Sequence, residues 1–210
     1  MQNSFEVIKM APENTNSILV VSGSDCVIFD AWGHADSWER LLQDRHLNLR
    51  AIYSTHGHGD HISASPYLAE RFGIDWYLNH KDLPLILWSN FLLNSFGLPG
   101  FSENILSPKD LQSGEVNILP GIDMKVYEAP GHSKGGLVFY LASLNLLITG
   151  DTIFHNGFGR TDLPGGSTTE LKQSISKIKA LNLPENTYVV HGHDKNSTIG
   201  WLNKYNEYFA

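Results

Sequence analysis

Four side chains that can bind a metal ion fall within six residues of the chain: His56, His58, Asp60 and His61. Imidazole nitrogens and carboxylate oxygens are ligands that zinc binds well, at roughly 2.0–2.2 Å. Glycines at positions 57 and 59 allow a tight turn that aims neighbouring side chains at a common point. A solvated polar loop is the alternative interpretation, but so dense a set of ligands favours a metal site.

Three later segments add candidate ligands. His132 stands in Ala-Pro-Gly-His-Ser, Asp151 in Thr-Gly-Asp-Thr, and His191 and His193 in the run His-Gly-His-Asp. Taken singly these residues are weak candidates, because a histidine after a Pro-Gly turn can be incidental and an aspartate also caps helices. The last segment offers two imidazoles, and either could be a ligand.

The elements that must position these side chains alternate between strands and helices. Apolar runs bounded by turn residues predict strands over 17–21, 26–29, 51–55, 124–129, 137–141, 146–149 and 188–190. Helices are predicted from an N-cap at Asp36, over 63–72, behind a capping box from Ser167 to Glu170, and over 199–209. This alternation indicates an α/β architecture. The candidate ligands directly follow strands, whose ends are rigid places from which to hold a ligand.

The composition fits one globular domain that spans residues 1–210. The chain is 41% apolar and 18% charged, and its length suffices for one sizeable core. The formal net charge of −7 argues against a nucleic-acid partner, because binding phosphates calls for a basic face.

Several features favour a cytoplasmic protein that does not enter a membrane. Cys26 is the single cysteine, so no intrachain disulfide can form, as suits a reducing compartment. The N-terminal residues lack the basic start and apolar run of a signal peptide. The most apolar stretch, 83–93, is interrupted by polar residues and reaches about half the length that a bilayer requires.

The order H-x-H-x-D-H, Gly-His, Gly-Asp and a C-terminal Gly-His resembles the metallo-β-lactamase superfamily over nearly the full chain. The resemblance implies a four-layer αββα sandwich with two metal ions at one edge of its sheets. One ion would be held by three histidines and the other by an aspartate and two histidines, with an aspartate bridging both: His56, His58 and His132; Asp60, His61 and His193; and Asp151. A bridging aspartate is the pattern of the hydrolase branches, and the antibiotic-degrading β-lactamases generally lack it.

Within the superfamily, the run from Phe158 to Ser167 (Phe-Gly-Arg-Thr-Asp-Leu-Pro-Gly-Gly-Ser) resembles the short, single-domain form of glyoxalase II. That resemblance implies hydrolysis of a thioester such as S-lactoylglutathione, or of another small-molecule thioester or ester. The chain ends about where the C-terminal helical domain of full-length glyoxalase II would begin. Because that domain supplies much of the glutathione site, the identity of the thiol stays open.

The same resemblance implies two divalent metal ions, with zinc as the first expectation and iron or manganese as alternatives. A hydroxide bridging the two ions would attack the carbonyl carbon, Asp60 would orient it, and a thiolate would leave. Arg160 would bind a carboxylate of the substrate; the competing interpretation is a buried ion pair with Asp162 that fixes the loop.

Some residues depart from the family pattern or lack a partner at ligand spacing. Alignment on the Gly-His pair selects His193 as the ligand. We interpret His191 as a surface residue at a strand end, with a supporting position behind the metal ligands as the alternative. Trp32 is interpreted as a core residue, and ordinary structural or surface roles are expected for His34, His46, His80 and His155. The apolar segment 83–101 is expected to form core or a homodimer contact, with a substrate lid as the alternative.

Three other functions compete with this interpretation. A persulfide dioxygenase of the same fold would use a single iron, but that group usually reads Arg-Thr-Asp-Phe-Gln where this chain has Arg-Thr-Asp-Leu-Pro at 160–164. A nuclease of the same fold is disfavoured by the net negative charge of the chain. A non-catalytic binding or scaffold protein would tend to lose ligands, whereas all seven positions are filled here.

Overall fold

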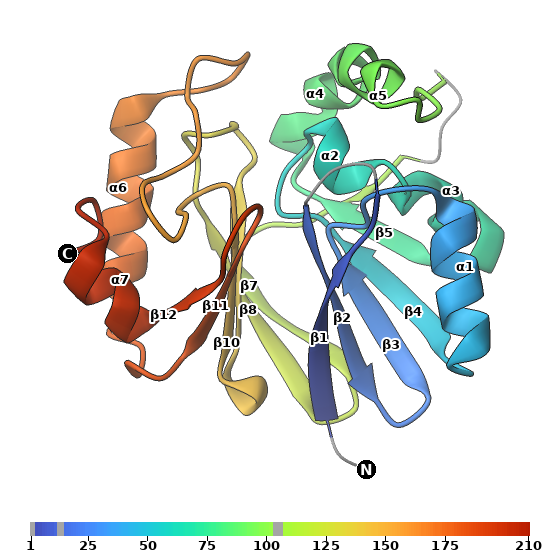
Figure 1. Cartoon of the computed structure of the whole chain (residues 1–210), viewed down its shortest axis with the longest axis horizontal. Coiled ribbons are helices and arrows are strands. Elements are labelled where there is room, and N and C mark those ends of the chain that lie inside the picture. The colour runs from blue at the N-terminus through green and yellow to red at the C-terminus, as the bar shows by residue number, and fades with distance from the viewer. Residues whose placement is uncertain (1–2, 12–14, 103–106) are drawn as a thin grey trace.

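The computed structural model describes residues 3–11, 15–102 and 107–210, and two six-stranded sheets make up its centre (Figure 1). In the first sheet the strands follow the order of the chain: β1 (Asn3–Lys9), β2 (Asn16–Ser22), β3 (Asp25–Phe29), β4 (Asn48–Tyr53), β5 (Asp75–Leu78) and β6 (Lys109–Asp110). The first three strands pair antiparallel, and β3 to β6 pair parallel.

In the second sheet, too, neighbouring strands are consecutive in the chain: β7 (Gly114–Leu119), β8 (Ile122–Glu128), β9 (Leu137–Leu141), β10 (Leu146–Gly150), β11 (Tyr188–His191) and β12 (Ser197–Thr198). Only β10 and β11 pair parallel in this sheet. Parallel neighbours need a crossover connection, and here a helix provides it.

Helices cover the outer face of each sheet (Figure 1). Against the first sheet lie α1 (Ala35–Asp44) and α3 (Ser65–Phe72), and against the second lie α6 (Thr168–Lys179) and α7 (Ile199–Tyr205). Shorter helices complete the described chain: α2 (Gly59–Ile62), η1 (His80–Asp82), α4 (Leu83–Trp88), α5 (Asn90–Ser95) and η2 (Ala142–Leu144). None of the helices in the described ranges is long and apolar enough to cross a membrane.

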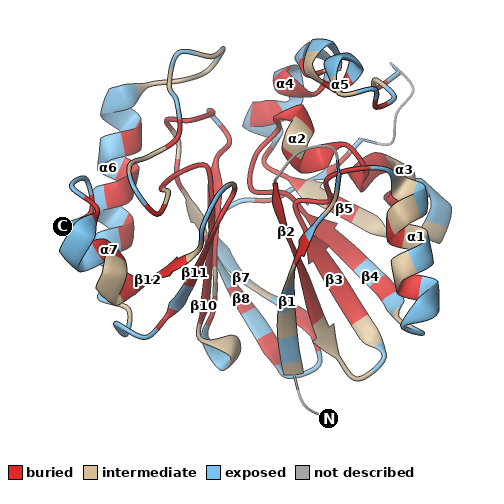
Figure 2. Cartoon of the chain, viewed as in Figure 1, coloured by how far each residue is buried: buried red, intermediate tan, exposed pale blue. Residues whose placement is uncertain are grey.

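The inner strands of each sheet are buried on both faces (Figure 2), because successive side chains point to opposite sides and each sheet lies between helices and the other sheet. In β3, Cys26 and Ile28 pack beneath the helices of the first sheet with Trp38, while Val27 and Phe29 enter the cluster between the sheets. In β10, Leu147 packs beneath α6 and α7, whereas its neighbours Leu146 and Ile148 face the first sheet. Three apolar layers therefore separate four structural layers, and the predicted αββα sandwich is confirmed.

Most predicted elements are present, but several of their ends needed correction, including the helix predicted over 63–72, which begins at Ser65. The helix predicted from an N-cap at Asp36 begins at Ala35 with His34 at the N-cap, and the Asp36 carboxylate instead binds Arg71 at 2.7 Å. The strand predicted over 51–55 runs from 48 to 53, and the helix predicted over 199–209 ends at Tyr205. The predicted N-cap at Ser167 is confirmed, because the Glu170 amide donates to Ser167 Oγ at 3.3 Å. The full capping box was wrong, because the Ser167 amide donates to the carbonyl oxygen of Gly131 at 2.7 Å and not to the Glu170 side chain.

Candidate metal centre

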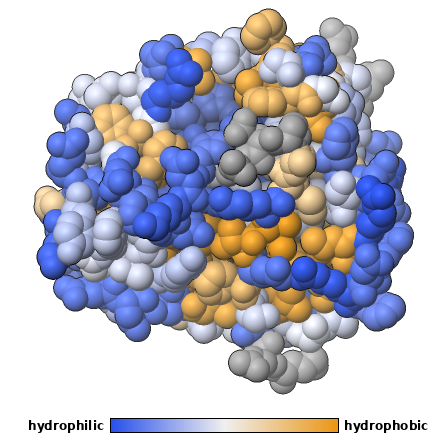
Figure 3. All heavy atoms as spheres, viewed as in Figure 1, coloured by the Kyte–Doolittle hydropathy of each residue, from blue (hydrophilic) through white to orange (hydrophobic). Residues whose placement is uncertain are grey.

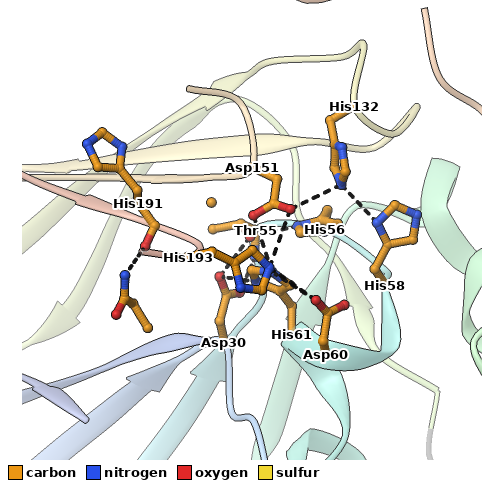
Figure 4. A network of polar contacts seen from close by, with 12 residues as sticks. Asp30, Thr55, His56, His58, Asp60, His61, His132, Asp151, His191 and His193 are labelled. Carbon is orange, nitrogen blue, oxygen red and sulfur yellow. Dashed lines mark hydrogen bonds and ion pairs between the residues drawn. The ribbon is translucent and has the colours of Figure 1, made fainter. Parts of the chain in front are cut away.

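Seven candidate ligands meet at one end of the two sheets (Figure 4). The first sheet contributes four of them from the loop after β4 and from α2: His56, His58, Asp60 and His61. The second sheet contributes the other three from the loops after β8, β10 and β11: His132, Asp151 and His193. The structure thus brings together every residue that the sequence analysis assigned as a metal ligand.

Within this cluster the side chains form the two predicted triads. His56, His58 and His132 have ligand atoms within 4.8 Å of one another, and so do Asp60, His61 and His193. In the first triad His58 Nδ1 lies 2.9 Å from His132 Nε2. In the second, His193 Nε2 lies 3.1 Å from Asp60 Oδ2 and 3.4 Å from His61 Nε2.

Asp151 lies between the triads. Its Oδ1 is 3.4 Å from His61 Nε2 in one triad, and its Oδ2 is 3.5 Å from His132 Nε2 in the other. Gly192 makes room for this carboxylate, because a Cβ at position 192 would overlap Asp151 Oδ1. A carboxylate in contact with both triads has the placement that a bridging ligand requires.

The polar atoms of the cluster fit bound cations. Asp151 Oδ1 and His56 Nε2 are buried and have no hydrogen-bond partner. A buried polar atom without a partner costs about 1–3 kcal/mol, which a metal ion at the cluster would offset. Nitrogen and carboxylate donors at a strand end are also the ligand types that zinc and iron take.

Hydrogen bonds behind the cluster fix which ring nitrogen faces it. His61 Nδ1 donates to Asp30 Oδ2 at 2.9 Å, and His132 Nδ1 donates to the carbonyl oxygen of Arg160 at 2.7 Å. Both rings therefore present Nε2 to the cluster, in the arrangement that metal-binding histidines usually have. Asp30 is itself held by the amide and hydroxyl of Thr55, at 2.7 and 2.8 Å.

A second buried carboxylate, Asp82, joins the two loops that carry the first triad. It accepts from the Gly57 amide at 3.0 Å, from Ser133 Oγ at 2.6 Å and from the Gly135 amide at 2.6 Å. Sequence reasoning missed the roles of Asp30 and Asp82, because neither lies within a ligand motif. A lone aspartate before an apolar helix resembles an ordinary cap, and the contact between the two loops is made only in the folded chain.

Burial and charge act in opposite directions on the acids and bases of the cluster. Burial, reinforced by the neighbouring histidines, lowers the pKa of His56 well below its usual value. For His61 burial disfavours the charged ring, but Asp30, Asp151 and Asp60 outweigh it and raise the pKa well above the usual value. In the same way the histidines around Asp151 overcome its burial and hold its pKa well below the ordinary range. Asp151 is thus favoured as a carboxylate and His56 as a neutral ring, which are the forms in which these residues bind a metal ion.

His191 does not belong to the cluster, and its interpretation as a surface residue was wrong. The side chain is 1% exposed; Nδ1 donates to the carbonyl oxygen of Ile153 at 2.7 Å, and Nε2 lies 2.8 Å from Ser197 Oγ. Figure 4 shows its ring directed away from the ligands. Burial lowers the pKa of His191 to about 4.

Two aromatic residues lie where the sequence analysis expected them, whereas the ion pair of the loop after β10 does not. Trp32 is fully buried in the core, as predicted, and the ring of His155 stacks on Trp201 with centroids 4.4 Å apart. Arg160 and Asp162 do form an ion pair, with two contacts of 2.7 Å, but the predicted burial of this pair was wrong. Their side chains are 63% and 67% exposed.

A cavity of about 850 Å³ opens above the cluster, and five of the candidate ligands line it: His58, Asp60, His132, Asp151 and His193. Part of the segment 83–101 borders this cavity. Leu93 and Phe101 are buried, as the core interpretation requires, but Trp88 and Phe91 face the cavity and are 43% and 87% exposed. The segment is thus partly core and partly the wall of the candidate active site.

Comparisons with known proteins agree with this geometry. The family model described as the metallo-beta-lactamase superfamily matches residues 10–193. The chain is 33% identical to the probable metallo-hydrolase YqgX of Bacillus subtilis, over 90% of each chain. It is 31% identical to the hydroxyacylglutathione hydrolase GloC of Haemophilus influenzae, over 94% of this chain and 93% of that one.

Two solved structures are similar over almost the whole fold. The B3 metallo-beta-lactamase BLEG-1 has a TM-score of 0.87 and 31% identity, covering 99% of this chain and 100% of its own. The di-iron-bound form of TTHA1623 has a TM-score of 0.84 and 30% identity, covering 97% and 99%. With the layered fold and the two ligand triads, these matches show that the chain belongs to the metallo-β-lactamase superfamily.

Proposed function

We propose that this protein is a dinuclear metal-dependent hydrolase of thioesters, with S-lactoylglutathione as the first substrate to test. The observation that carries the proposal is the position of Asp151 between two triads of ligands, with oxygens 3.4 and 3.5 Å from a histidine of each. Two ions held there would polarise the substrate carbonyl and lower the pKa of a water towards neutrality. Zinc is the first expectation, and the similarity to a di-iron protein makes iron the leading alternative.

The protein's own residues would position the reactants. Asp60 lies on the floor of the cavity beside His193, where its carboxylate can orient the attacking water. The water oxygen forms a bond to the carbonyl carbon and the carbon–sulfur bond breaks, so that the products are a carboxylic acid and a thiol. Since a thiol has a pKa near ~8.5, the thiolate leaves without a separate general acid.

A second function, hydrolysis of β-lactams, is favoured by one specific observation: the similarity to BLEG-1 at 31% identity. Both reactions need the same attack of water on a carbonyl carbon. The similarity to GloC and the carboxylate at position 151 favour the thioester, so we place the β-lactam second.

The test is turnover by protein loaded with zinc or iron, with metal content measured by elemental analysis. We expect loss of the thioester absorbance of S-lactoylglutathione, two ions per chain, and at least about a 100-fold lower rate for His132→Ala, since one triad then lacks a ligand. Hydrolysis of a cephalosporin without thioester turnover would establish the second function instead. Oxygen uptake with a persulfide and one iron per chain would point to a dioxygenase.

A further inference from the structure

Apart from the metal ligands and Arg160, the cavity is lined by apolar side chains. When the five candidate ligands are set aside, six of the seven remaining lining residues are apolar: Trp88, Phe91, Leu92, Phe154, Phe158 and Leu163. A volume of about 850 Å³ exceeds what a lactoyl group fills and lies within the usual range for ligand pockets.

These side chains form two facing walls. Trp88, Phe91 and Leu92 come from α4 and α5, which lie above the first sheet, whereas Phe154 and Phe158 come from the loop after β10 of the second sheet (Figure 1). Any group that is attached to a carbonyl at the metal ligands must therefore lie between apolar surfaces of both halves of the molecule.

The aromatic rings reach the ligands themselves. The Trp88 ring centroid is 6.0 Å from that of His58, and the Phe154 centroid is 6.2 Å from that of His193. Phe158 is held in place by Tyr208, whose ring meets it edge-on at 4.4 Å. An apolar group of the substrate can therefore contact these rings even when it is attached close to the reacting carbonyl.

Charge in the cavity does not match an anionic peptide thiol. Of the described residues that line it, Arg160 is the one permanent cation, and both of its contacts at 2.7 Å go to Asp162. Glutathione carries two carboxylates, and both would have to compete with Asp162 for one guanidinium. Exposed ion pairs contribute little, so that competition is feasible for one carboxylate, but the wall offers no cation for the second.

Apolar surface remains open to water at the mouth of the cavity. Phe91 is 87% exposed and Trp88 43% exposed, and Figure 3 shows apolar side chains gathered on the surface over α4 and α5. Exposed apolar surface beside a polar centre usually marks a binding site, because a ligand removes that surface from water.

From these observations we propose that the cavity binds an aryl or alkyl group of the substrate. Preferred substrates are then thioesters with such a group on the acyl or the thiol side, ahead of thioesters of a charged peptide thiol. This inference rests on the proposed thioester hydrolysis, since it names the substrate class of the same site.

Two matched series of substrates test it. One compares phenylacetyl with acetyl thioesters of N-acetylcysteamine; the other compares acetyl thioesters of phenylmethanethiol and mercaptoethanol. We expect kcat/KM to rise about 10-fold or more with the phenyl group in at least one series, since a hydrophobic pocket gains about that factor from a small apolar group. The series that responds identifies the side of the thioester that enters the cavity. Equal kcat/KM values in both series would overturn the proposal.

Phe91→Ser and Leu87→Ser form a matched pair of variants. Both side chains are exposed, at 87% and 51%, so neither substitution removes a core contact, but only Phe91 lines the cavity. We expect Phe91→Ser to reduce the preference for phenyl substrates at least about threefold and Leu87→Ser to keep it. The same effect of the two variants would contradict the assignment of this wall.

Binding of an unreactive benzyl thioether, measured by calorimetry, separates this inference from the proposed function. A thioether that binds at least about 10-fold more tightly than its hydroxyethyl analogue, with the difference reduced in Phe91→Ser, supports the apolar site even if no thioester is hydrolysed. In that case only the reaction would be wrong. If thioesters were hydrolysed but neither turnover nor binding favoured the phenyl or benzyl group, the proposed reaction would stand and the apolar site would be rejected.

Discussion

At the scale of single residues, Asp82 decides how two ligand loops face each other. Its carboxylate is fully buried and accepts three hydrogen bonds, one from the loop of His58 and two from the loop of His132. Burial raises the pKa of Asp82 although the three donors oppose that shift. Gly57 is part of the same arrangement, because a Cβ there would come within 2.8 Å of the Asp82 carbonyl oxygen.

We predict that Asp82→Asn weakens metal binding about 10- to 100-fold, the usual effect of removing a partner behind the ligands. The amide has nearly the same shape, but its NH₂ group would face a donor: the Gly135 amide on one side, or Ser133 and Gly57 on the other. Affinity is measured by titration against a chelator of known strength. Asp123→Asn, at an exposed position on β8, is the control. An affinity equal to that of the control would show that Asp82 does not position the ligands.

At the scale of elements, the sequence was informative where local pattern decides the structure. Glycine-spaced ligands after apolar runs predicted the strand ends that carry candidate ligands, because a strand end and a tight turn are local features. Which of these ends meet was implied by the resemblance to the superfamily. The strands β1, β5 to β7 and β12 were not predicted. In β1, for example, mostly exposed and half-exposed residues alternate, so its apolar pattern is weak.

The walls of the cavity could not be predicted for a different reason. The run from Leu83 to Leu93 is apolar throughout most of its length, and periodicity does not distinguish a side chain in the core from one that lines a cavity. The outcome depends on the opposite wall, Phe154 and Phe158, which lies more than 60 residues later in the chain. Such pairing between distant segments exists only in the folded molecule.

The turn after β11 separates the directions of two neighbouring histidines, His191 and His193. Residues two apart in a strand point to the same side, but β11 ends at His191 and the chain turns, with Asp194 at a φ of 61°. His191 therefore points towards Ile153 and Ser197, and His193 towards the ligands.

We predict opposite effects for the two alanine variants. His191→Ala should keep both metal ions and lower the free energy of unfolding by about 1–3 kcal/mol, since it leaves buried partners unpaired. His193→Ala should lose one of the two ions. Elemental analysis and urea unfolding of the metal-free proteins measure the two effects separately. If His191→Ala lost an ion and His193→Ala retained both, the assignment would be reversed.

At the scale of the whole molecule, the metal centre joins the two halves of the sandwich. Four candidate ligands follow β4 or lie in α2 of one half, and three follow strands of the other. Hydrogen bonds also join the halves near this end, such as those from Asn16 to the carbonyl oxygens of Gly192 and His191 at 2.7 and 2.9 Å. Because the ligands meet only in the folded chain, bound metal stabilises the folded state.

The last prediction follows from this linkage. At a metal concentration 100 times the Kd, one site adds about 2.7 kcal/mol to the free energy of unfolding, so chelation should lower Tm by at least about 5 °C in a chain of this length. Readdition of zinc should restore the Tm, whereas chelator should have much less effect on Asp151→Ala.

Cys26 supplies an independent readout of the same effect. It is the single cysteine, it is fully buried, and burial raises the pKa of its thiol to about 12, so a thiol reagent at pH 8 reacts only when the chain opens. Chelation should therefore speed its labelling in parallel with the fall in Tm. If both the Tm and the labelling rate were unchanged after the metal had been removed, the centre would not hold the two sheets together.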